Sequence, residues 1–368
     1  MPDIFFNLKG DGMLRQKTAQ YFATLFGLLL LASTAAAQKL PNVMILATGG
    51  TIAGTGATST TTVGYTAATV GVQQLIQAVP ELTKVANVTG EQVFQIASES
   101  MTNEHWLTLG KRVNALLAQP DVDGIVITHG TDTLEETGYF LNLVVKSRKP
   151  VVLVGAMRPS TALSADGPIN LYNAVLVAGS ADAAGKGVLL ALGDQIHSAR
   201  DVTKTNTSTP DSFKTPELGM LGYVQGGKAF FYRSSTRKHT ADTEFDIGAL
   251  QALPQVDIVY GYANMNTVAL DAFVAAGAKG IIHAGTGDGS LAAKVKPGLV
   301  AARKKGTIIV RGSRVGNGIL ARNGEANDDE LDFVVADTLN PQKARILLML
   351  ALTKTNSTKD IQRMFYTY

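Results

Sequence analysis

Two segments of the chain place hydroxyl side chains in glycine-rich turns. Thr51 lies in TGGTIAG (residues 48–54), and Thr131 and Asp132 lie in THGTDT (residues 128–133), each after a short apolar run. Small neighbours would let a substrate reach both a hydroxyl and backbone N–H groups, which can stabilise an oxyanion by about 3 kcal/mol per donor. A threonine hydroxyl is a weak nucleophile and needs a nearby proton acceptor. The pattern therefore indicates acyl transfer at Thr51, with Thr131 and Asp132 as its partners.

A lysine in a third segment could complete this set. Lys204 lies in RDVTKTN (residues 200–206), and its ammonium could exchange protons beside Asp132 if the side chain is buried. The alternative interpretation is that Thr51 and Thr131 only cap turns and that Lys204 is solvated. The spacing of these residues does not decide between the two interpretations.

The composition and the motifs exclude most other kinds of reaction centre. The chain has no cysteine, which excludes disulfides, thiolate metal sites and a cysteine nucleophile. Its five histidines form no spacing typical of a metal site, and it has no G-x-S-x-G motif. Gly49 and Gly54 have the outer spacing of a phosphate-binding loop, but the Lys-Ser/Thr pair that must follow is missing. We therefore expect no metal and no cofactor, and we expect His129 to be packed or bonded to the backbone.

Short strands that alternate with helices must position the reactive residues. Helical spacing of apolar residues predicts helices over residues 102–117, 134–145 and 340–353. The alternation predicts a two-domain α/β fold, with a larger, mostly parallel N-terminal sheet, a smaller parallel C-terminal domain, and ligands at the carboxyl ends of the strands. The predicted strands are apolar, rich in β-branched residues and typical of a sheet covered on both faces; they span residues 43–47, 124–128, 151–154, 188–192, 258–260, 281–283 and 307–310.

The N-terminal segment has the pattern of an export signal. Arg15 and Lys17 precede an uncharged, mostly apolar run that ends in three alanines at positions 35–37. The apolar centre is too short to span a bilayer and has the length of a signal-peptide core. Met13 is an alternative start of the chain. We therefore expect a periplasmic protein without a membrane anchor after cleavage.

The composition of the remaining chain is that of a globular protein. Hydrophobic residues make up 45% and charged residues 17%, and the formal net charge is only +3. These values exclude a disordered chain and do not indicate a nucleic-acid-binding surface. A polar stretch over residues 233–246 predicts a linker. The predicted division is a signal peptide (1–37), an N-terminal domain (38–232), a linker (233–254) and a C-terminal domain (255–368).

At its motifs the chain resembles the type II bacterial L-asparaginases and glutaminase-asparaginases. TGGTIAG and THGTDT with the following LEET are the two signatures of that family, and their joint occurrence is highly specific. Three further segments also agree with the family: GAMRPSTALSADGP (155–168), ARDVTKTN (199–206) and LNPQKAR (339–345). The resemblance covers essentially the whole chain after residue 37. It implies hydrolysis of a side-chain amide of L-asparagine or L-glutamine, without a cofactor, by a dimer of close dimers.

The resemblance also implies roles for individual residues. Thr51 corresponds to a nucleophile that forms an acyl-enzyme ester, and Tyr65 to the tyrosine of a mobile lid loop. Thr131, Asp132 and Lys204 correspond to the rest of the catalytic set, and the first two also to substrate-binding positions. Five more residues correspond to positions that contact the substrate. Ser98 and Glu99 correspond to positions at its α-carboxylate and α-amino groups, and Ala156 to a position near the amide. Asn264 and Glu325 correspond to residues that a neighbouring subunit contributes.

Motifs that differ between branches of this family bear on the choice of amide. Glu99 is similar to glutaminase-active members, and HAGTGDGS (283–290) resembles the same branch, whereas MRPSTALSADGP resembles the asparaginase branch. We therefore expect an asparaginase with substantial glutaminase activity. The sequence does not say which group deprotonates Thr51.

The main alternative function is an exported amino-acid-binding protein without catalysis, which would also have two α/β domains around a ligand. Such a protein would bind its ligand without releasing ammonia, and it gives no reason for a threonine in each turn. A protease with an N-terminal threonine is a weaker alternative, because Thr51 is internal and cleavage before Gln38 would not expose it.

Overall fold

An eight-stranded sheet forms the larger part of the protein in the computed structural model, which describes residue 2 and residues 39–368. Residues 41–368 form one compact unit, and the predicted signal segment lies outside the described residues except for residue 2. The strand order is β10-β9-β6-β5-β4-β3-β1-β2. Its first five strands in the sequence are parallel: β1 (Asn42–Gly49), β2 (Asn87–Ile96), β3 (Gly124–Thr128), β4 (Val151–Val154) and β5 (Val188–Leu192). The other three are antiparallel: β6 (Gln195–Ser198), β9 (Gly222–Gln225) and β10 (Lys228–Phe231).

Helices cover both faces of this sheet, which explains why its central strands are apolar throughout. Ile125 and Ile127 of β3 pack in one hydrophobic cluster with α3 (Asn103–Leu117) and α4 (Leu134–Val144). Val126, between them, packs in a second cluster that includes α5 (Gly167–Ala178) and α2 (Val72–Gln77). Strands buried on both faces need apolar side chains at successive positions rather than at alternate ones.

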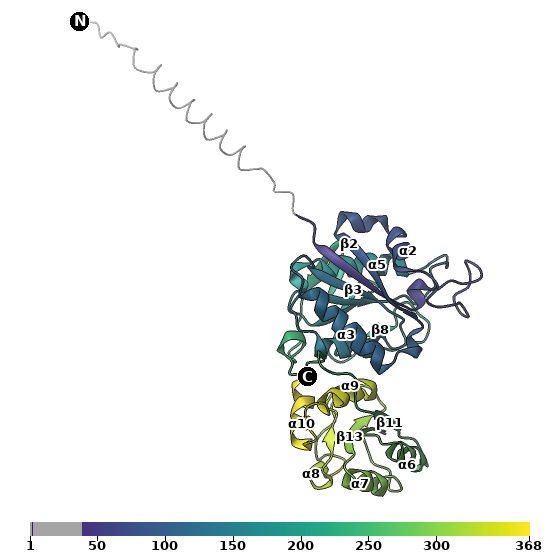
Figure 1. The fold of residues 1–368 in the computed structure, drawn as a ribbon, viewed down its shortest axis with the longest axis vertical. Coiled ribbons are helices and arrows are strands. Elements are labelled where there is room, and N and C mark those ends of the chain that lie inside the picture. The colour runs from purple at the N-terminus through teal and green to yellow at the C-terminus, as the bar shows by residue number, and fades with distance from the viewer. Residues whose placement is uncertain (1, 3–38) are drawn as a thin grey trace. The chain divides into compact units, whose positions relative to one another are not determined.

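A second, four-stranded sheet follows in the C-terminal part of the chain (Figure 1). All of its strands are parallel: β11 (Val256–Tyr260), β12 (Gly280–Gly285), β13 (Ile308–Ser313) and β14 (Val334–Val335). The helices of this part are α6 (Val268–Ala275), α7 (Lys296–Lys304), α8 (Asp328–Leu331), α9 (Pro341–Ala351) and α10 (Thr358–Thr367). The predicted fold class is confirmed, with a large mostly parallel sheet and a smaller parallel one.

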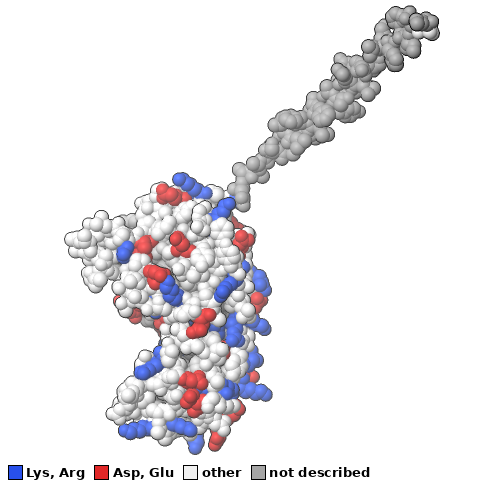
Figure 2. Space-filling view, turned by 180° about the vertical axis from the view of Figure 1, so that it is seen from behind, with Lys and Arg blue, Asp and Glu red and all other residues white. Residues whose placement is uncertain are grey.

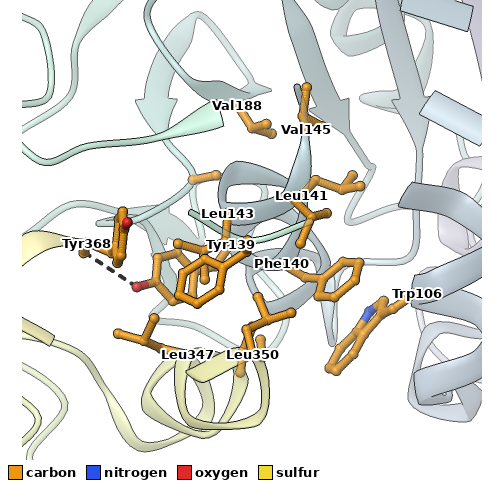
Figure 3. Close-up of a cluster of buried hydrophobic side chains, with 14 of the residues drawn as sticks. Trp106, Tyr139, Phe140, Leu141, Leu143, Val145, Val188, Leu347, Leu350 and Tyr368 are labelled. Atoms are coloured by element: carbon orange, nitrogen blue, oxygen red, sulfur yellow. Dashed lines mark hydrogen bonds between the residues drawn. The ribbon is translucent and has the colours of Figure 1, made fainter. Parts of the chain in front are cut away.

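The two sheets share one hydrophobic cluster, which joins α4 to α9. Figure 3 shows Tyr139 and Phe140 of α4 beside Leu347 and Leu350 of α9, and all four side chains are fully or almost fully buried. The Tyr139 hydroxyl donates a hydrogen bond to the carbonyl oxygen of Tyr368 at 3.4 Å. The packing of α9 on α4 therefore ties the four-stranded sheet to the larger one.

The polar stretch predicted as a linker is anchored to the larger part. The Thr243 hydroxyl donates to the carbonyl oxygen of Leu143 at 2.6 Å, and the Lys146 ammonium donates to the Thr243 carbonyl at 2.8 Å. Phe245 and Ile247 are buried in the shared cluster. The division into two domains at residues 233–254 stays a prediction, but this segment is packed and not a free tether.

His129 lies in the turn that follows β3 and belongs to a series of buried hydrogen bonds. Its Nδ1–H donates to the carbonyl oxygen of Gly130 at 2.7 Å, and its Nε2 accepts from the Thr137 hydroxyl at 2.9 Å. Thr137 accepts in turn from the indole N–H of Trp106 at 2.9 Å. This arrangement confirms the expectation that His129 is packed and backbone-bonded. Burial lowers the pKa of His129 to about 4, since the charged ring would lose its hydration.

This buried histidine should make the fold sensitive to mild acid. In the unfolded chain a histidine takes up a proton near pH 6.5, but folded His129 resists protonation until about pH 4. The stabilisation is therefore complete above pH 6.5 and is lost as the pH falls from 6.5 towards 4. We expect His129 to contribute a drop of about 2 kcal/mol in unfolding free energy between pH 7 and pH 5.

Chemical denaturation of the wild type and of His129→Gln at these two pH values measures the contribution. The variant should be less stable at pH 7, because it loses buried hydrogen bonds, but its stability should fall less between pH 7 and pH 5. An equal fall in both proteins would contradict the assignment.

Candidate active site

The turns after β1 and β3 touch each other at two glycines. β1 and β3 are adjacent parallel strands, so their carboxyl ends lie at the same edge of the sheet. Gly50 has φ +81°, and a Cβ added there would lie 2.2 Å from the backbone nitrogen of Gly130. A Cβ added at Gly130 would lie 2.5 Å from Ser98 Oγ. Side chains at either position would push the segments apart, so the glycines allow Thr51, Thr131 and Ser98 to converge.

Thr51 begins a short 3₁₀ turn (Thr51–Ala53) directly after Gly50 and is only 7% exposed. Its hydroxyl oxygen lies 2.7 Å from the hydroxyl oxygen of Tyr65, and the two groups form a hydrogen bond. Thr55 and Thr66 form an antiparallel bridge across the loop that carries Tyr65. This bridge brings the end of the loop back towards Thr51. The structure therefore brings the predicted nucleophile and the predicted lid tyrosine into direct contact.

The loop that carries Tyr65 is attached to the segment after β4. Both the backbone N–H and the hydroxyl of Ser160 donate to the carbonyl oxygen of Gly54, at 2.9 and 2.7 Å. The N–H of Gly56 donates to the Thr161 hydroxyl at 2.8 Å. These contacts hold the first residues of the loop, and with them the approach of Tyr65 to Thr51.

The second predicted group also assembles. The Lys204 ammonium donates to the Thr131 hydroxyl at 2.9 Å and to the Asp132 carboxylate at 2.6 Å. Lys204 lies in β7 (Thr203–Lys204), which pairs with β8 (Phe213–Lys214) in a two-stranded ribbon. The Lys204 side chain is 16% exposed and the Asp132 side chain 61% exposed. The alternative interpretation of a solvated lysine is wrong, because this ammonium is largely buried and bonded to both partners.

Ser98 fastens the second group to a third segment. Its hydroxyl accepts from the backbone N–H of Asp132 at 3.2 Å, and its carbonyl accepts from the Thr133 hydroxyl at 2.8 Å. Ser98 is buried, whereas Glu99 beside it is exposed. Ala156 is fully buried just after β4, one strand farther along the same edge. These residues lie at the carboxyl edge of the sheet, as the sequence predicts.

Asn264 and Glu325 are not brought to Thr51 by any contact within the described part of the chain. Asn264 accepts from the Lys294 ammonium at 3.2 Å, and Glu325 accepts from the Ser290 hydroxyl at 3.2 Å. Both side chains are exposed, on loops of the four-stranded sheet. The prediction that they serve a neighbouring subunit stays a prediction.

A buried ion pair holds the loop that carries Glu325. Arg311 and Asp328 are both fully buried, and their side chains meet at 2.8 Å. The same guanidinium donates to the carbonyl oxygens of Asp288 and Ala321, each at 2.6 Å. The loop before α8 is therefore fixed to β13 from both ends.

The sequence reasoning missed a buried acidic group that is close in sequence to the predicted catalytic set. Glu135, three residues after Asp132, is buried and accepts from the Gln342 amide at 2.8 Å. The Lys343 ammonium lies 3.9 Å from the same carboxylate. The sequence motifs LEET and LNPQKAR contain these residues, but no local pattern indicates that two segments about 200 residues apart meet.

Three general features of the described residues bear on the kind of site. Among residue 2 and residues 39–368, no group of three or more His, Asp or Glu side chains is arranged to hold a metal ion. No helix among the residues that the structure describes is long and apolar enough to cross a membrane. Acidic and basic side chains both lie scattered over the face that Figure 2 shows.

Comparison with known proteins gives matches over nearly the whole described chain. Residues 42–237 match the family "Asparaginase, N-terminal", and residues 255–365 match the "Glutaminase/Asparaginase C-terminal domain". A glutaminase-asparaginase of Pseudomonas fluorescens biotype A is 58% identical over 331 residues, which cover 90% of this chain and 91% of the relative. L-asparaginase 2 of Bacillus subtilis is 56% identical over 337 residues, which cover 92% and 89% of the two chains.

A solved structure agrees with the fold. The crystal structure titled as a probable cytoplasmic L-asparaginase from Campylobacter jejuni has a TM-score of 0.87 and 49% sequence identity to this protein. The match covers 89% of this chain and all of that chain. The two family models together match most of the chain, and the relatives and the solved structure match it at 49–58% identity. The chain therefore belongs to the asparaginase family.

Proposed function

We propose that this protein hydrolyses the side-chain amide of L-asparagine, and that of L-glutamine, to release ammonia and aspartate or glutamate. The relatives are named for these two activities. The observation that supports the proposal is the close approach of Gly50 and Gly130. One of these glycines precedes Thr51, which is bonded to Tyr65, and the other precedes Thr131, which is bonded to Lys204. A binding protein without catalysis gives no reason for a threonine in each of these turns.

The proposed reaction passes through an ester on Thr51. The Thr51 oxygen attacks the amide carbon, its proton moves to a neighbouring group, and the carbon–nitrogen bond breaks as the nitrogen leaves as ammonia with an added proton. Water then forms a bond to the acyl carbon, the ester bond breaks, and the Thr51 oxygen regains a proton. No redox cofactor is needed, because no electrons are gained or lost.

The two hydrogen-bonded groups suit the two halves of this reaction. Tyr65 is bonded to the Thr51 hydroxyl at 2.7 Å, so we propose that its oxygen relays the proton in the first step. Lys204 is bonded to the Thr131 hydroxyl at 2.9 Å and to the Asp132 carboxylate at 2.6 Å, so we propose that this group orients the water of the second step and that the proton of the water passes through Thr131 and Lys204 to Asp132. Backbone N–H groups of the glycine turns stabilise the oxyanion in both steps.

The carboxylates and hydroxyls around these groups would hold the amino-acid end of the substrate. Glu99 and Asp132 are exposed carboxylates beside the buried Ser98, and a substrate α-ammonium would lie against them. The Ser98 hydroxyl is a donor for the α-carboxylate, and Ala156 contributes backbone near the amide. Because Glu99 resembles the residue of the glutaminase-active branch of the family, we propose that both amides are substrates.

We further propose that the protein is exported and that it assembles as a dimer of close dimers. Residues 1–37 have the pattern of a signal peptide, although the related Campylobacter structure is titled cytoplasmic. The exposed positions of Asn264 and Glu325 suit a role in the site of a neighbouring subunit. N-terminal sequencing of the secreted protein and light scattering would test the two points: a start other than Gln38, or a monomeric mass, would contradict them.

Replacing Thr51 by alanine tests the proposed nucleophile. The wild type should release ammonia from both amides, and Thr51→Ala should lose activity on both by more than about 10³-fold, because no ester can form. Thr51→Ser, which keeps a hydroxyl, should retain part of the activity. Thr307→Ala removes another buried threonine hydroxyl far along the chain, bonded to Ala278, and should be as active as the wild type.

These variants also separate the proposed function from its alternatives. Ammonia release by Thr51→Ala at the wild-type rate would exclude Thr51 from the mechanism. Binding of asparagine by the wild type without ammonia release would instead support a binding protein.

Because the chain has no cysteine, Lys204 can be replaced and then chemically restored. Lys204→Cys should lower kcat by about 10²–10⁴-fold, since the ammonium that handles protons is gone. Alkylation of this single thiol with 2-bromoethylamine regenerates a lysine-like ammonium and should return much of the lost activity. The alkylated wild type is the control, and a Lys204→Cys protein within tenfold of wild-type activity would contradict the role of Lys204.

The contact between the two turns can be tested at Gly50. Gly50→Ala forces a Cβ to within 2.2 Å of the Gly130 nitrogen, so the turns must separate and kcat should fall by about 10²-fold or more. Gly185→Ala is the matched control, because Gly185 also has positive φ (+70°) but has no atom within 4 Å of an added Cβ. It should lose about 1 kcal/mol of stability and no activity. Equal activity losses in the two variants would show that backbone strain, and not the contact, is responsible.

A further inference from the structure

Lys343 is a lysine buried in an unfavourable place. It lies in the first turn of α9 and is only 2% exposed. The N-terminal end of a helix carries partial positive charge, which disfavours an ammonium there. Burial also removes the hydration of the charge, and it lowers the pKa of Lys343 to about 8. The hydrogen bonds and the ion pair of the Lys343 ammonium must compensate for this cost.

The contacts of Lys343 converge on the segment that leads into Lys204. Its ammonium donates to the carbonyl oxygen of Arg200 at 2.8 Å and to that of Val202. These carbonyls lie four and two residues before Lys204, in a stretch where Ala199, Arg200 and Val202 are all buried. The ammonium therefore fixes the course of the chain immediately before β7.

The Lys343 ammonium also lies close to the segment that follows Asp132. Its counter-charge is Glu135, at 3.9 Å, in the first turn of α4. Glu135 also accepts from the amides of Gln342, at 2.8 Å, and Asn340, at 3.4 Å. Asp132, which accepts from Lys204, precedes Glu135 by three residues. One buried polar cluster thus holds the segments on both sides of the Lys204–Asp132 ion pair.

Stability alone does not account for this arrangement. A buried ion pair is often no more stabilising than well-packed neutral side chains of similar size. What a buried ammonium with two carbonyl partners provides is a defined geometry, because the alternative arrangements leave polar groups unpaired.

From these contacts, and resting on the function proposed above, we propose that Lys343 is a positioning residue that acts through Lys204: it sets the place of the Lys204 ammonium against Thr131 and Asp132. Lys343 does not touch the reacting atoms. Its effect on the reaction is carried by the backbone from Arg200 to Lys204.

A double-mutant cycle with Lys204 tests this proposal. Lys343→Met fills the same space without the ammonium, and it should lower kcat by about 10- to 100-fold, the loss that a shift of about 1 Å produces in a catalytic group. In the Lys204→Met background there is no ammonium to place, so Lys343→Met should change the residual kcat by less than about twofold. If instead the fold-losses of kcat in the two single variants multiply in the double variant, Lys343 acts independently of Lys204 and the proposal is overturned.

The cycle also separates this proposal from the proposed function. If Lys204→Met alone remains fully active, the catalytic role of Lys204 fails, and the role of Lys343 fails with it. If Lys204→Met is inactive while Lys343→Met has wild-type kcat, only the present proposal fails.

A second variant guards against loss of folding. Lys343→Met leaves the Glu135 charge buried and unpaired, which could destabilise the fold. Lys343→Met combined with Glu135→Gln removes both charges and keeps the shape, and it should unfold at a higher temperature than Lys343→Met alone, with the same loss of kcat. Glu135→Gln alone, which keeps the Lys343 bonds to the two carbonyls, should lose less kcat than the double variant. Failure of the double variant to fold would assign Lys343 to the stability of the fold and overturn the proposal.

Discussion

The close approach of two backbone turns is the constraint on which the site depends. Adjacent parallel strands bring their carboxyl ends to one edge, but side chains at those ends would normally keep the following turns apart. Gly50 and Gly130 remove both obstacles, and the Thr48 hydroxyl ties the strand ends by donating to the Thr128 carbonyl at 2.8 Å. Thr51 and Thr131 follow the two glycines by one residue each. The two proposed reactive threonines, which lie 80 residues apart in the sequence, are thus positioned by contacts of the backbone itself.

A site made of small hydroxyl groups needs a rigid support, and the core of the larger sheet supplies it. The turn after β3 rests on His129, which is bonded through Thr137 to the Trp106 indole. Each polar group in this series of three hydrogen bonds has a partner. The series can therefore be buried without the penalty of an unpaired donor or acceptor. Trp106 also stacks on Phe140 of α4, with ring centroids 5.7 Å apart. The position of the Thr131 turn is therefore set by aromatic packing.

The extent to which the sequence predicts this structure follows from how local each signal is. The central strands were predictable because strands covered on both faces are continuously apolar, as in VMILA and GIVIT. β2 was not, since its sequence NVTGEQVFQI mixes polar and apolar residues and its side chains are only partly buried. The short antiparallel strands at the other edge also lack a strong pattern. In the site, Thr51, Thr131 and Lys204 stood out by their motifs, whereas Lys343 did not. Its burial depends on contacts with residues about 140 positions away, and no local pattern encodes such a contact.

The shared core of the two sheets lets the C-terminal part support the proposed site of its own subunit. α9 packs on α4 through Leu347 and Leu350 (Figure 3). The first turn of α9 carries the polar cluster around Lys343. Hydrophobic packing is strong but not directional, so it brings α9 to α4 without fixing the register. The buried hydrogen bonds at the start of α9 fix it, because each has only one geometry that leaves no polar group unpaired. None of the residues placed with Thr51 in the proposed site, which are Tyr65, Thr131, Asp132 and Lys204, comes from the smaller parallel sheet. The C-terminal part can therefore still determine how Lys204 is held, through the contacts of α9.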